Sequence, residues 1–441
     1  MMVKEVTVRA KDYLIPDDWE ANRLIECLDF KNGKAFYKVG YTNQGKKVID
    51  LMNISREGKF QELDGKQKYI SKEDYEKYSD YQLEKNDLII AMSDMSKKLW
   101  ILGRTAIIPK NNEYILNQRI GKLSYNGNMD IKFANYATNA NYFLRQLKVV
   151  AKGTAQKYVN TGEIKNSIIF SPPFEEQKKI ALILSSVDQT IEKTDEVIEK
   201  TKELKKGLMQ QLLTKGIGHD EFKEVSVGPF EINIPKEWEV LDFKDVLDDL
   251  KSGLSRKLQS EDVGVPVIRS TNMVNGKINF EDIKYWYWKD PKGANVENYL
   301  LREGDILVNF INSMAHIGKA CIYKDMGRKV IYTTNVFRTR VNEDIIKNKY
   351  FYYYTQSNYY QKEIERISKQ AVNQASFTTG DFKNIFIPLP PLEEQKKIAA
   401  ILSTVDEKIQ KEEEYKEKLE ELKKGLMQKL LTGEVRVKVA N

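Results

Sequence analysis

Cysteine and histidine, which often act as nucleophiles, general bases or metal ligands, are scarce in this sequence of 441 residues. There are two cysteines, Cys27 and Cys321, and two histidines, His219 and His316. These four residues match neither the spacing of a zinc site nor a disulfide framework. No Ser/His/Asp or Cys/His grouping stands out that would support nucleophilic catalysis. We therefore expect no metal site, no cofactor and no catalytic residue in this chain.

One short motif resembles a catalytic loop. Ser171-Pro172-Pro173-Phe174 is similar to the loop with which DNA amino-methyltransferases hold the target amine and stack the base. A second copy reads Leu389-Pro390-Pro391-Leu392 and lacks both the polar and the aromatic residue. No glycine-rich dinucleotide loop or Walker-type phosphate loop occurs either. We interpret the prolines as the lead-in to a helix, and a self-contained DNA methyltransferase is the enzymatic alternative.

Side chains suited to binding a polyanion are better represented. The net charge is +7, from 71 Lys and Arg against 64 Asp and Glu, which is compatible with nucleic-acid binding without proving it. Phosphate contacts need Lys or Arg, and base edges are read by Arg, Lys, Asn and Gln. The alternative is an ordinary solvated surface. The candidate DNA-binding residues, which are basic, amide or aromatic and lie in loop-like segments, are Lys34, Tyr37, Lys38, Lys46, Lys47, Arg104, Lys152, Gln156, Lys157, Lys251, Arg256, Lys257, Arg269, Asn272, Lys319, Lys369, Asn373 and Gln374.

An internal duplication supplies the elements that must position these side chains. Segment 172–214 returns as 390–432 without a gap, with about 30 of roughly 43 positions identical. A weaker echo covers the rest of each half. The echoed positions are Ile15-Pro16-x-x-Trp19 with Ile234-Pro235-x-x-Trp238, Asn53 with Asn272, and Asn86-Asp87 with Gly304-Asp305. The sequence therefore predicts two diverged globular domains, each followed by a near-identical helix.

Each copy of the repeat predicts one helix of about 40 residues, or about 60 Å. Prolines followed by two glutamates mark its start, because proline suits the first turn and acids complement the helix dipole. Apolar residues then recur at steps of three and four on a Lys/Glu-rich background, which is typical of a coiled coil. The first helix leads from one domain to the next and the second leads back, so we expect them to pack antiparallel. The predicted coiled-coil interface consists of Ile180, Leu184, Val187, Ile191, Ile198, Leu204, Leu208, Leu212, Ile398, Leu402, Val405, Ile409, Leu419, Leu422, Leu426 and Leu430.

Two glycines, Gly207 and Gly425, lie inside these helices at equivalent positions. Glycine in a helix interior costs about 1 kcal/mol relative to alanine. We interpret both as points of close approach or bending, and the alternative is a glycine tolerated near a fraying end.

The predicted organisation is an α+β fold in which two mixed α/β domains are separated by two long helices that form an antiparallel coiled coil, with a pseudo-two-fold internal repeat. The expected segments are 1–171 for domain one, 172–216 for the first helix, 217–388 for domain two, 389–434 for the second helix and 435–441 for a tail. Inside the domains we expect short helices at 23–28, 243–250, 142–150 and around 350–366, and strands at 48–51 and 306–310.

Hydropathy and the first residues bear on the cellular compartment. No apolar run approaches the roughly 18 residues that a membrane span needs, so we expect no membrane association. Met1-Met2-Val3-Lys4-Glu5 lacks the apolar stretch of a secretory signal. We therefore expect a cytoplasmic protein.

The duplicated helix resembles the specificity (S, or HsdS) subunits of type I restriction-modification systems. The resemblance rests on Pro-Pro-x-x-Glu-Gln-x-x-Ile, present twice, with each copy ending in Leu-Met-Gln-x-Leu-Leu-Thr. The Ile-Pro-x-x-Trp heads and the segments around Asp87 and Asp305 fit the same pattern. One departure is Asn86, where the second domain has Gly304, and we expect it to affect loop geometry alone.

The resemblance implies a non-catalytic subunit whose two globular parts are target recognition domains, each reading one half of a bipartite double-stranded DNA sequence. The helices then form the spacer and dock two methyltransferase subunits, and two restriction subunits complete the complex. S-adenosylmethionine, ATP and magnesium are expected on those partners. A rigid helix pair would hold the half-sites apart by one to two DNA turns of about 34 Å each. The competing hypothesis is a coiled-coil adaptor protein that binds no DNA.

Overall fold

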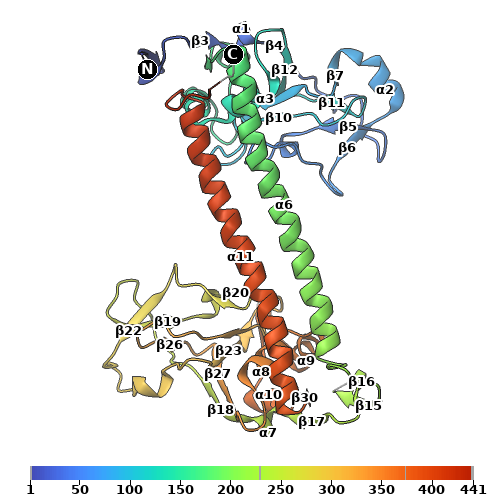
Figure 1. Cartoon of the computed structure of the whole chain (residues 1–441), viewed down its shortest axis with the longest axis vertical. Coiled ribbons are helices and arrows are strands. Elements are labelled where there is room, and N and C mark those ends of the chain that lie inside the picture. Colours follow the sequence, from blue (N-terminus) through green and yellow to red (C-terminus); the bar gives the residue numbers. More distant parts are fainter. Residues whose placement is uncertain (1, 228–229, 373, 439–441) are drawn as a thin grey trace. The chain divides into compact units, whose positions relative to one another are not determined.

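The computed structural model describes residues 2–227, 230–372 and 374–438, and Figure 1 shows the course of the chain. The chain divides into two compact units. Unit 1 consists of Met1–Asp195 and Glu414–Asn441, and unit 2 of Glu196–Glu413. The helices α6 (Phe174–Leu212) and α11 (Leu392–Leu430), each of 39 residues, pass from one unit into the other. Each unit thus combines one α/β domain with the first part of one long helix and the last part of the other.

The domain of unit 1 is built from short strands and helices. Its strands are β1 (Val3–Val8), β2 (Lys11–Pro16), β3 (Glu20–Arg23), β4 (Leu28–Asn32), β5 (Lys46–Ile49), β6 (Lys68–Ile70), β7 (Gln82–Leu83), β8 (Leu88–Ala91), β9 (Ser93–Asp94), β10 (Thr105–Ile107), β11 (Tyr114–Leu116), β12 (Ile120–Tyr125), β13 (Lys157–Tyr158) and β14 (Ile168–Ser171). Its helices are α1 (Leu24–Cys27), η1 (Leu51–Asn53), α2 (Lys72–Lys77), η2 (Ser79–Tyr81), α3 (Ile131–Asn139), α4 (Asn141–Val149) and α5 (Thr161–Lys165).

The domain of unit 2 repeats this plan with different loops. Its strands are β15 (Phe222–Val227), β16 (Phe230–Pro235), β17 (Glu239–Asp242), β18 (Leu247–Ser252), β19 (Gly264–Ile268), β20 (Met273–Val274), β21 (Lys277–Ile278), β22 (Lys284–Tyr287), β23 (Ile306–Asn309), β24 (Ile311–Asn312), β25 (Ala320–Ile322), β26 (Ile331–Tyr332), β27 (Val336–Val341), β28 (Lys369–Gln370), β29 (Ala375–Ser376) and β30 (Phe386–Leu389). Its helices are α7 (Phe243–Val246), η3 (Ser270–Asn272), η4 (Val296–Tyr299), α8 (Asn348–Tyr354), α9 (Asn358–Ile367) and α10 (Thr379–Lys383).

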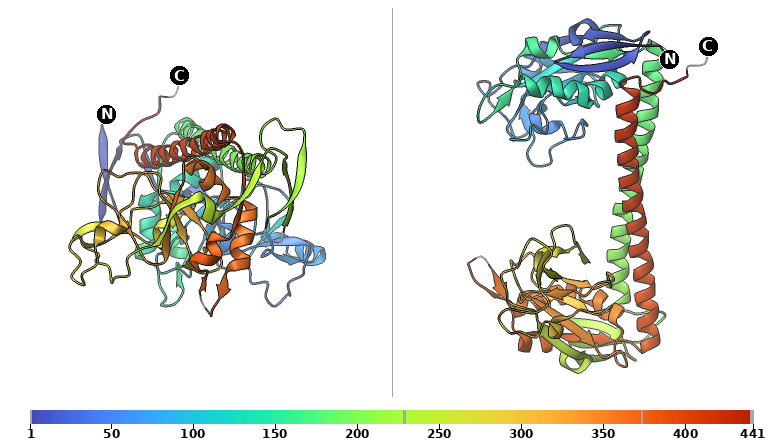
Figure 2. Two further views of the ribbon diagram at one scale, coloured as in Figure 1. Left: turned by 90° about the horizontal axis from the view of Figure 1, so that it is seen from below. Right: turned by 90° about the vertical axis from the view of Figure 1, so that its left-hand side faces the viewer.

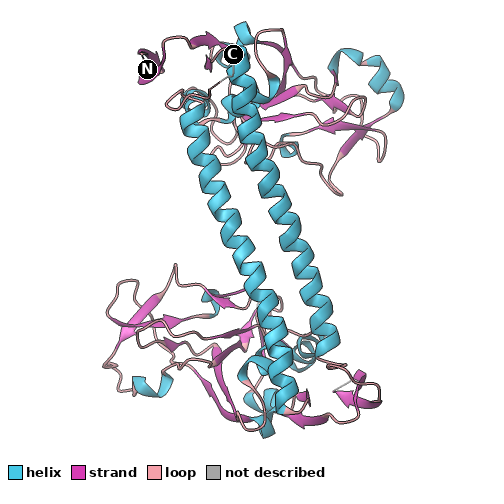
Figure 3. Cartoon of the chain, in the orientation of Figure 1, coloured by secondary structure: helices cyan, strands magenta, loops and turns pink. Residues whose placement is uncertain are grey.

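The two domains share their central sheets. In unit 1 the order is β10-β8-β12-β4, and in unit 2 the corresponding order is β25-β23-β27-β18, antiparallel throughout. A second sheet contains a parallel pair in both units, β5 with β11 and β19 with β26. Strands and helices occur together in each domain in Figure 3. The internal repeat therefore extends from the helices to the topology of the domains.

Asp87 and Asp305 hold the same turn at the start of β8 and β23. Asp87 forms an ion pair of 2.6 Å with Lys122, and Asp305 binds Arg340 through two hydrogen bonds of 2.7 and 2.9 Å. Asn86 adopts φ 72° where Gly304 has φ 87°. Asparagine tolerates this left-handed conformation better than most residues, so the turn is kept without the glycine, as expected.

The start of α6 is fixed by the duplicated motif. The side-chain amide of Gln177 donates to the carbonyl of Pro172 (2.9 Å) and its oxygen accepts the backbone N–H of Asp130 (2.8 Å), the residue before α3. The carboxylate of Glu176 accepts the indole N–H of Trp19 (3.2 Å), and both side chains are buried. The Ile-Pro-x-x-Trp and Pro-Pro-x-x-Glu-Gln motifs are therefore a matched pair that joins the domain to its helix.

Unit 2 repeats these contacts at the start of α11. Gln395 donates to the carbonyl of Pro390 (2.8 Å) and accepts the N–H of Lys347 (2.8 Å), while Glu394 accepts the indole N–H of Trp238 (3.0 Å). This explains the prolines as a helix lead-in, because their carbonyls serve as acceptors for the following glutamine.

The segment after each long helix contacts the start of the other helix. In unit 1, Arg436 follows α11 and binds Glu176 with two hydrogen bonds of 2.8 Å. In unit 2, His219 follows α6 and lies 2.9 Å from Glu394. The carboxylate that binds the tryptophan thus also anchors the chain that leaves the opposite helix.

Within each unit the helix segments run antiparallel, as charged pairs between them show, and they lie side by side in both views of Figure 2. The pairs are Asp188–Lys423 (2.7 Å) and Asp195–Lys416 (2.6 Å) in unit 1, and Lys205–Asp406 (2.6 Å) and Lys202–Glu413 (3.7 Å) in unit 2. In both sets the residue number rises along one helix as it falls along the other. The pairing direction agrees with the prediction.

Of the sixteen predicted interface residues, ten are buried, four are half-buried and two are exposed. The buried ones are Ile180, Leu184, Ile191, Ile198, Leu212, Ile398, Leu402, Ile409, Leu419 and Leu430, and the half-buried ones are Val187, Leu208, Val405 and Leu426. Leu204 and Leu422 are 56% and 51% exposed, so their assignment to the interface is wrong. The buried positions repeat every seven residues, as at Leu184, Ile191 and Ile198, which places Lys205 on the seam; Leu204 points about 100° away from it.

Three further expectations need correction. Gly207 and Gly425 are not close-approach points, because a Cβ at either position would have no neighbour within 4 Å. The short helix expected at 243–250 ends at Val246, and strand β18 follows from Leu247. The helix expected around 350–366 is two helices, α8 and α9.

Candidate nucleic-acid interface

Four segments of unit 1 form one continuous polar edge, here called edge 1: residues 34–38, 92–100, 117–119 and 152–158. Backbone hydrogen bonds join them in sequence. The bonds run from Gln118 N–H to Lys34 O (2.9 Å), from Met92 N–H to Arg119 O (2.9 Å) and from Val159 N–H to Met92 O (2.9 Å), and β13 pairs with β9. Residues more than a hundred positions apart in sequence are thereby brought onto one surface.

Unit 2 contains the equivalent edge 2: residues 254–258, 310–319, 333–335 and the described part of 369–376. Its joining bonds run from Leu254 N–H to Tyr332 O (2.9 Å), from Phe310 N–H to Asn335 O (3.2 Å) and from Phe377 N–H to Phe310 O (3.3 Å), and β24 pairs with β29. The two edges have the same backbone plan and different side chains.

A glycine makes the crossing behind each edge possible. A Cβ on Gly33 would lie 1.8 Å from the carbonyl oxygen of Asn117, and a Cβ on Gly253 would lie 2.2 Å from that of Tyr332. Both clashes would be with backbone, which cannot move aside. The loops that carry Lys34 and Arg256 start immediately after these glycines, so the same close approach places both loops.

Edge 1 gathers several of the predicted residues. Tyr37, Lys38 and Lys152 are exposed, and Lys157 is half-buried. Among the described residues the side chains of Lys38, Lys152 and Lys157 make no ion pair. Gln156 donates to the hydroxyl of Ser93 (3.2 Å), which connects the hairpin of β13 to β9. The unpaired lysines leave positive charge available for phosphate groups.

Lys34 is on this edge but is held by aromatic rings. Its ammonium group lies 5.0 Å from the ring centre of Tyr78 and 5.8 Å from that of Tyr81. Such cation–π contacts fix the stem of the side chain. Lys34 therefore shapes the edge as well as contributing charge to it.

Two residues at the tip of edge 1, Gln118 and Arg119, were absent from the prediction. Both are exposed, and within the described part of the chain neither side chain has a hydrogen bond or ion pair. Arg119 has φ 70°, a strained conformation for a residue that is not glycine. Their positions in unit 2 are taken by Thr334 and Asn335. No basic run or aromatic neighbour marks Gln118 and Arg119 in the sequence, so only the fold reveals them.

A second group missed by the prediction surrounds Trp100, which is 43% exposed. The guanidinium of Arg56 lies 5.0 Å and the ammonium of Lys98 lies 5.5 Å from the Trp100 ring. Met95, five residues before Trp100 in the sequence, is 76% exposed. The run Lys97-Lys98-Leu99-Trp100 carries the basic and aromatic signal that identified the other segments and could have been found by the same criterion.

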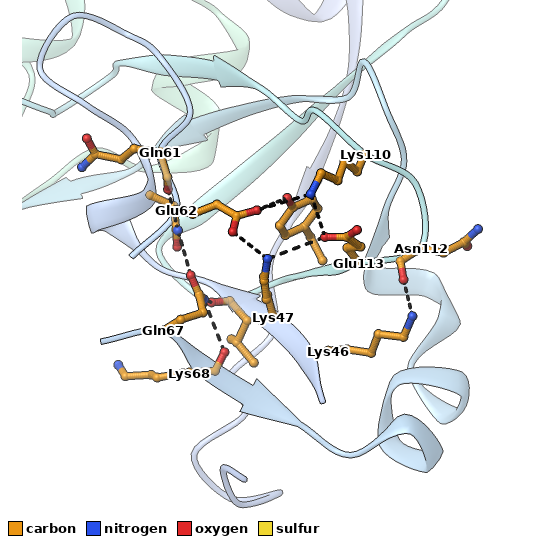
Figure 4. Close-up of polar contacts among 12 residues, drawn as sticks. Lys46, Lys47, Gln61, Glu62, Gln67, Lys68, Lys110, Asn112 and Glu113 are labelled. Atoms are coloured by element: carbon orange, nitrogen blue, oxygen red, sulfur yellow. Dashed lines mark hydrogen bonds and ion pairs between the residues drawn. The ribbon is translucent and has the colours of Figure 1, made fainter. Parts of the chain in front are cut away.

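Lys46 and Lys47 are engaged inside the domain, as Figure 4 shows. The Lys47 ammonium lies 2.8 Å from Glu62 and 3.6 Å from Glu113, and Lys46 donates to the carbonyl of Asn112. Burial alone would lower the pKa of Lys47, but the hydrogen bond and charge of Glu62 outweigh it and raise the pKa. Lys46 and Lys47 both contact the loop between β10 and β11. Because their ammonium groups already have partners within the domain, they are less available to a ligand.

Arg104 is also committed internally. It donates to the carbonyl of Asn139 (3.0 Å), the last residue of α3, and burial lowers the pKa of its guanidinium. A cation at a helix C-terminus complements the helix dipole. The structure thus gives Arg104 a role in joining α3 to the sheet.

In unit 2 two predicted arginines line a groove with hydroxyl side chains, among them Ser255, Ser270 and Thr333. Arg256 binds Asp290 through bonds of 3.1 and 2.6 Å, and Arg269 pairs with Asp282 at 2.9 Å. The carboxylates hold both guanidinium groups in fixed positions at the wall of this groove.

Asn272 cannot contact a ligand, because it is only 3% exposed, and its prediction as a DNA-binding residue is wrong. Its side chain accepts the N–H of Arg269 (3.0 Å) and donates to the carbonyl of Asn279 (3.0 Å). Asn53 of unit 1 makes the same two contacts, with the N–H of Asp50 (2.8 Å) and the carbonyl of Gln61 (2.9 Å). The asparagine recurs because it closes the same turn.

The remaining candidates of unit 2 are exposed or half-buried. Lys257, Lys319, Lys369 and Gln374 are exposed, and Lys251 lies over the ring of Tyr299 at 5.3 Å. Asn373 lies outside the described residues. Val372, which follows β28, is 98% exposed.

Across residues 2–227, 230–372 and 374–438, no group of three or more His, Cys, Asp or Glu residues is arranged to hold a metal ion. In the same residues no helix is both long and apolar enough to cross a membrane.

The family model and the related proteins that match this chain point to the same family. The family described as "Type I restriction modification DNA specificity domain" matches residues 16–203 and 235–421. The type I restriction enzyme MjaVIII specificity subunit of Methanocaldococcus jannaschii is 30% identical over 436 residues, covering 97% of this chain and 95% of the relative. The EcoBI specificity subunit of Escherichia coli is 22% identical over 400 residues, covering 87% and 78%.

Solved structures share the fold. The S subunit of a type I restriction-modification system from M. genitalium aligns with a TM-score of 0.57 at 16% identity, covering 95% of this chain and 96% of that one. A chain from a study of complex assembly and conformational transition in a type I system aligns with a TM-score of 0.54 at 19% identity, covering 96% and 100%. The predicted α+β fold, with a repeated α/β domain and two long helices, is confirmed.

Proposed function

The chain belongs to the family of type I restriction-modification DNA specificity subunits, and we propose that each of its units reads one half of a bipartite double-stranded DNA target through its polar edge. One observation carries this proposal: the same backbone edge is built twice and presents different side chains. Two different half-sites can be read by one backbone arrangement if the side chains at its tip differ.

The side chains at the two tips differ in the base edges that they can contact. An arginine can donate two hydrogen bonds to a guanine edge and a glutamine can pair with adenine, whereas threonine and asparagine offer shorter groups. Lysines around them, such as Lys152 and Lys157 in unit 1, contact phosphates and set the position of the edge on the duplex. We therefore assign Gln118 and Arg119 to base reading and the lysines to backbone contacts.

Chemistry on the DNA belongs to partner subunits in this proposal. Two methyltransferase subunits dock on the helix pair and supply S-adenosylmethionine, and two restriction subunits supply the ATP- and magnesium-dependent steps. Methylation of a base requires that it leave the stack, and the methyltransferase subunit performs that step on DNA positioned by the edges. The complex acts in the cytoplasm, where the host DNA lies.

The domain limits follow from the same assignment. We propose residues 1–171 and 217–388 as the target recognition domains, 172–216 and 389–434 as the spacer helices, and 435–441 as a tail. The contacts of Arg436 with Glu176 support a structural use for the first part of that tail.

DNA binding by the chain in complex with its methyltransferase subunit tests the proposal. The target is first identified by sequencing the bases that the complex methylates, and affinity for that duplex is then measured by fluorescence anisotropy at several salt concentrations. We expect Lys152→Ala to weaken binding and reduce the slope of log K against log salt by about 1. Arg119→Ala should weaken binding about 10- to 100-fold with little change in slope.

Lys85→Ala is the matched control, because Lys85 is exposed and precedes β8, whereas edge 1 follows the other end of that strand. It should leave affinity and slope unchanged. Binding that is insensitive to salt, or the absence of any DNA binding by the complex, would favour the adaptor hypothesis instead.

A further inference from the structure

A partly buried Tyr–Asp–Lys cluster in unit 1 joins the domain to both helices. Asp188 of α6 accepts hydrogen bonds from the hydroxyl of Tyr136 on α3 (2.7 Å) and from the ammonium of Lys423 on α11 (2.7 Å). Lys59, from the loop after η1, adds a charge at 3.4 Å. Only 13% of the Asp188 side chain is exposed. One carboxylate thus connects the recognition domain, α6 and α11.

Unit 2 contains the same cluster with the two helices exchanged. Asp406 of α11 accepts a hydrogen bond from Tyr353 on α8 (2.9 Å) and pairs with Lys205 of α6 (2.6 Å). Each lysine also lies over the ring of its tyrosine, at 5.7 Å for Lys205 and 5.9 Å for Lys423. We call the two triads the clamps of units 1 and 2.

The duplication places the clamps at matching positions. Asp188 and Asp406 occupy equivalent places in the two copies of the helix, each after a valine, and so do Lys205 and Lys423. The tyrosines lie on α3 and α8, and Gln177 and Gln395 bind the residues that immediately precede these two helices. The clamps have therefore been kept while the loops of the two domains diverged.

The lysines stand where the coiled-coil seam would otherwise be apolar. Lys205 lies between Ile198 and Leu212 at seven-residue steps, and Lys423 lies seven residues before Leu430. A single polar residue at such a position costs stability and fixes the register of the helices, because only one register gives it a partner. The partner here is also bonded to the recognition domain.

The charge state of Asp188 favours the hydrogen bonds of the clamp of unit 1. Burial would raise the pKa of Asp188, but the hydrogen bonds of Lys423 and Tyr136 and the charge of Lys59 outweigh it and lower the pKa. Burial, together with the aspartate, raises the pKa of both tyrosines, which stay protonated as donors. The clamp of unit 1 therefore keeps an ionised acceptor with two donors from different elements.

From this geometry we infer that Tyr136–Asp188–Lys423 and Tyr353–Asp406–Lys205 are positioning residues that lock each recognition domain to the helix pair and so restrict the half-site spacing that the complex accepts. This inference rests on the proposed function, in which each domain reads one half-site. The clamps touch no DNA and act through the orientation of the edges.

Methylation of a DNA library tests the inference. The library carries both half-sites at the native spacing and at spacings one and two base pairs longer or shorter, and it is methylated by the chain in complex with its methyltransferase subunit. Tyr136→Phe removes one hydroxyl, and Asp188→Asn removes the charge. We expect both to keep the half-site sequences and to reduce discrimination between the native and the one-base-pair-shifted spacing by about tenfold.

Two further measurements separate positioning from general stability. The double variant Tyr136→Phe/Lys423→Met should lose no more discrimination than Lys423→Met alone, because the two residues act through one carboxylate. Asp188→Glu, which keeps the charge, should recover part of the discrimination. Lys202→Met, which breaks an exposed helix pair with Glu413, is the control and should leave spacing unchanged.

The outcomes are distinguishable. Clamp variants with native thermal stability and unchanged spacing preference would overturn the inference, and so would a loss of discrimination that merely parallels a fall in thermal stability across all variants. If the native complex shows no bipartite sequence preference at all, the proposed function fails instead. Tyr136→Phe, which deletes a single oxygen atom, keeps the inference testable should Asp188→Asn fail to fold.

Discussion

Single side chains decide which charges of this protein face a ligand. Lys47, Arg256 and Arg269 carry the charges that a phosphate would need, yet each has a carboxylate within 3 Å. Their partners, Glu62 for Lys47, Asp290 for Arg256 and Asp282 for Arg269, lie 13 or more positions away in sequence. Residue type alone identifies the Lys and Arg side chains. It does not show which of them form ion pairs, because their carboxylate partners are brought close only when the chain folds.

The buried asparagines give a prediction at this scale. Asn272→Ala should destabilise unit 2 by about 1–3 kcal/mol, since the N–H of Arg269 and the carbonyl of Asn279 would lose their partner. Thermal unfolding measures this, with Asn53→Ala as the matched change in unit 1. A variant of native stability with altered DNA sequence preference would show that Asn272 contacts bases.

The clamp of unit 1 predicts a pH dependence. The lowered pKa of Asp188 in the folded chain contributes stability that is fully present above the ordinary carboxyl value of about 3.9 and is lost as pH falls through the lowered value. Lys423→Met removes one source of that lowering. The difference in Tm between native chain and variant should therefore keep its full size from pH 7 down to about pH 4 and should narrow below that pH.

Thermal unfolding followed by circular dichroism between pH 3.5 and 7 measures that difference. The groups that face Asp188 are Tyr136, Lys423 and Lys59, with Glu192 beside Lys59. Lys202→Met serves as control, because its exposed partners are Glu199 and Glu413. A Lys423→Met deficit that is as large at pH 3.5 as at pH 7, or larger, would contradict the assignment.

At the scale of elements, some features of the long helices could be predicted from the sequence and others could not. The start of each helix and most of its apolar repeat follow from local spacing, and the antiparallel direction follows from the order of domains and helices along the chain; the structure agrees with these three predictions. Leu204 and Leu422 were misplaced because they satisfy a three-to-four step from their neighbours, while the seam holds a lysine one position later. The lysine is tolerated on the seam only because a distant aspartate binds it.

The two helix glycines give a prediction for an element. Neither Gly207 nor Gly425 has a neighbour that a Cβ would meet, and both are inside regular helix. Gly207→Ala and Gly425→Ala should each stabilise the chain by about 1 kcal/mol. Chemical denaturation of the single and double variants measures the change, and a destabilised variant would reveal a bend or contact that the helices require.

The short strands of the domains were the hardest elements to predict. Many have two to four residues, so no period of alternation can develop in them. They are recognisable because the two units repeat each other: β8 and β23 start after the same aspartate turn, and β4 and β18 lead into the same glycine crossing. The continuous edges could not be predicted, because they are assembled from four segments joined by backbone hydrogen bonds.

At the scale of the whole molecule, duplication separates what is kept from what varies. The kept parts are the matched tryptophan and glutamate, the glutamine at each helix start and the clamps. The varied parts are the edges. This division is expected of a protein that presents two unlike reading surfaces on one repeated frame.

Helix length gives a prediction at this scale. Removing seven residues from equivalent places, 192–198 and 410–416, keeps the heptad phase and shortens each helix by about 10 Å. The complex should then methylate a target with a shorter spacer and the same half-sites. Mapping the methylated bases tests this, and an unchanged spacer or changed half-sites would contradict a role for helix length in setting the spacing.

The central claim, that each unit reads its own half-site through its edge, is tested most directly by a change confined to one tip. Gln118→Thr with Arg119→Asn gives edge 1 the tip residues of edge 2, and the bases methylated by the complex in whole genomic DNA are then sequenced. The account predicts a changed sequence in one half of the target, with the other half and the spacer as in the native complex. A target left unchanged in both halves, or altered in both at once, would contradict it.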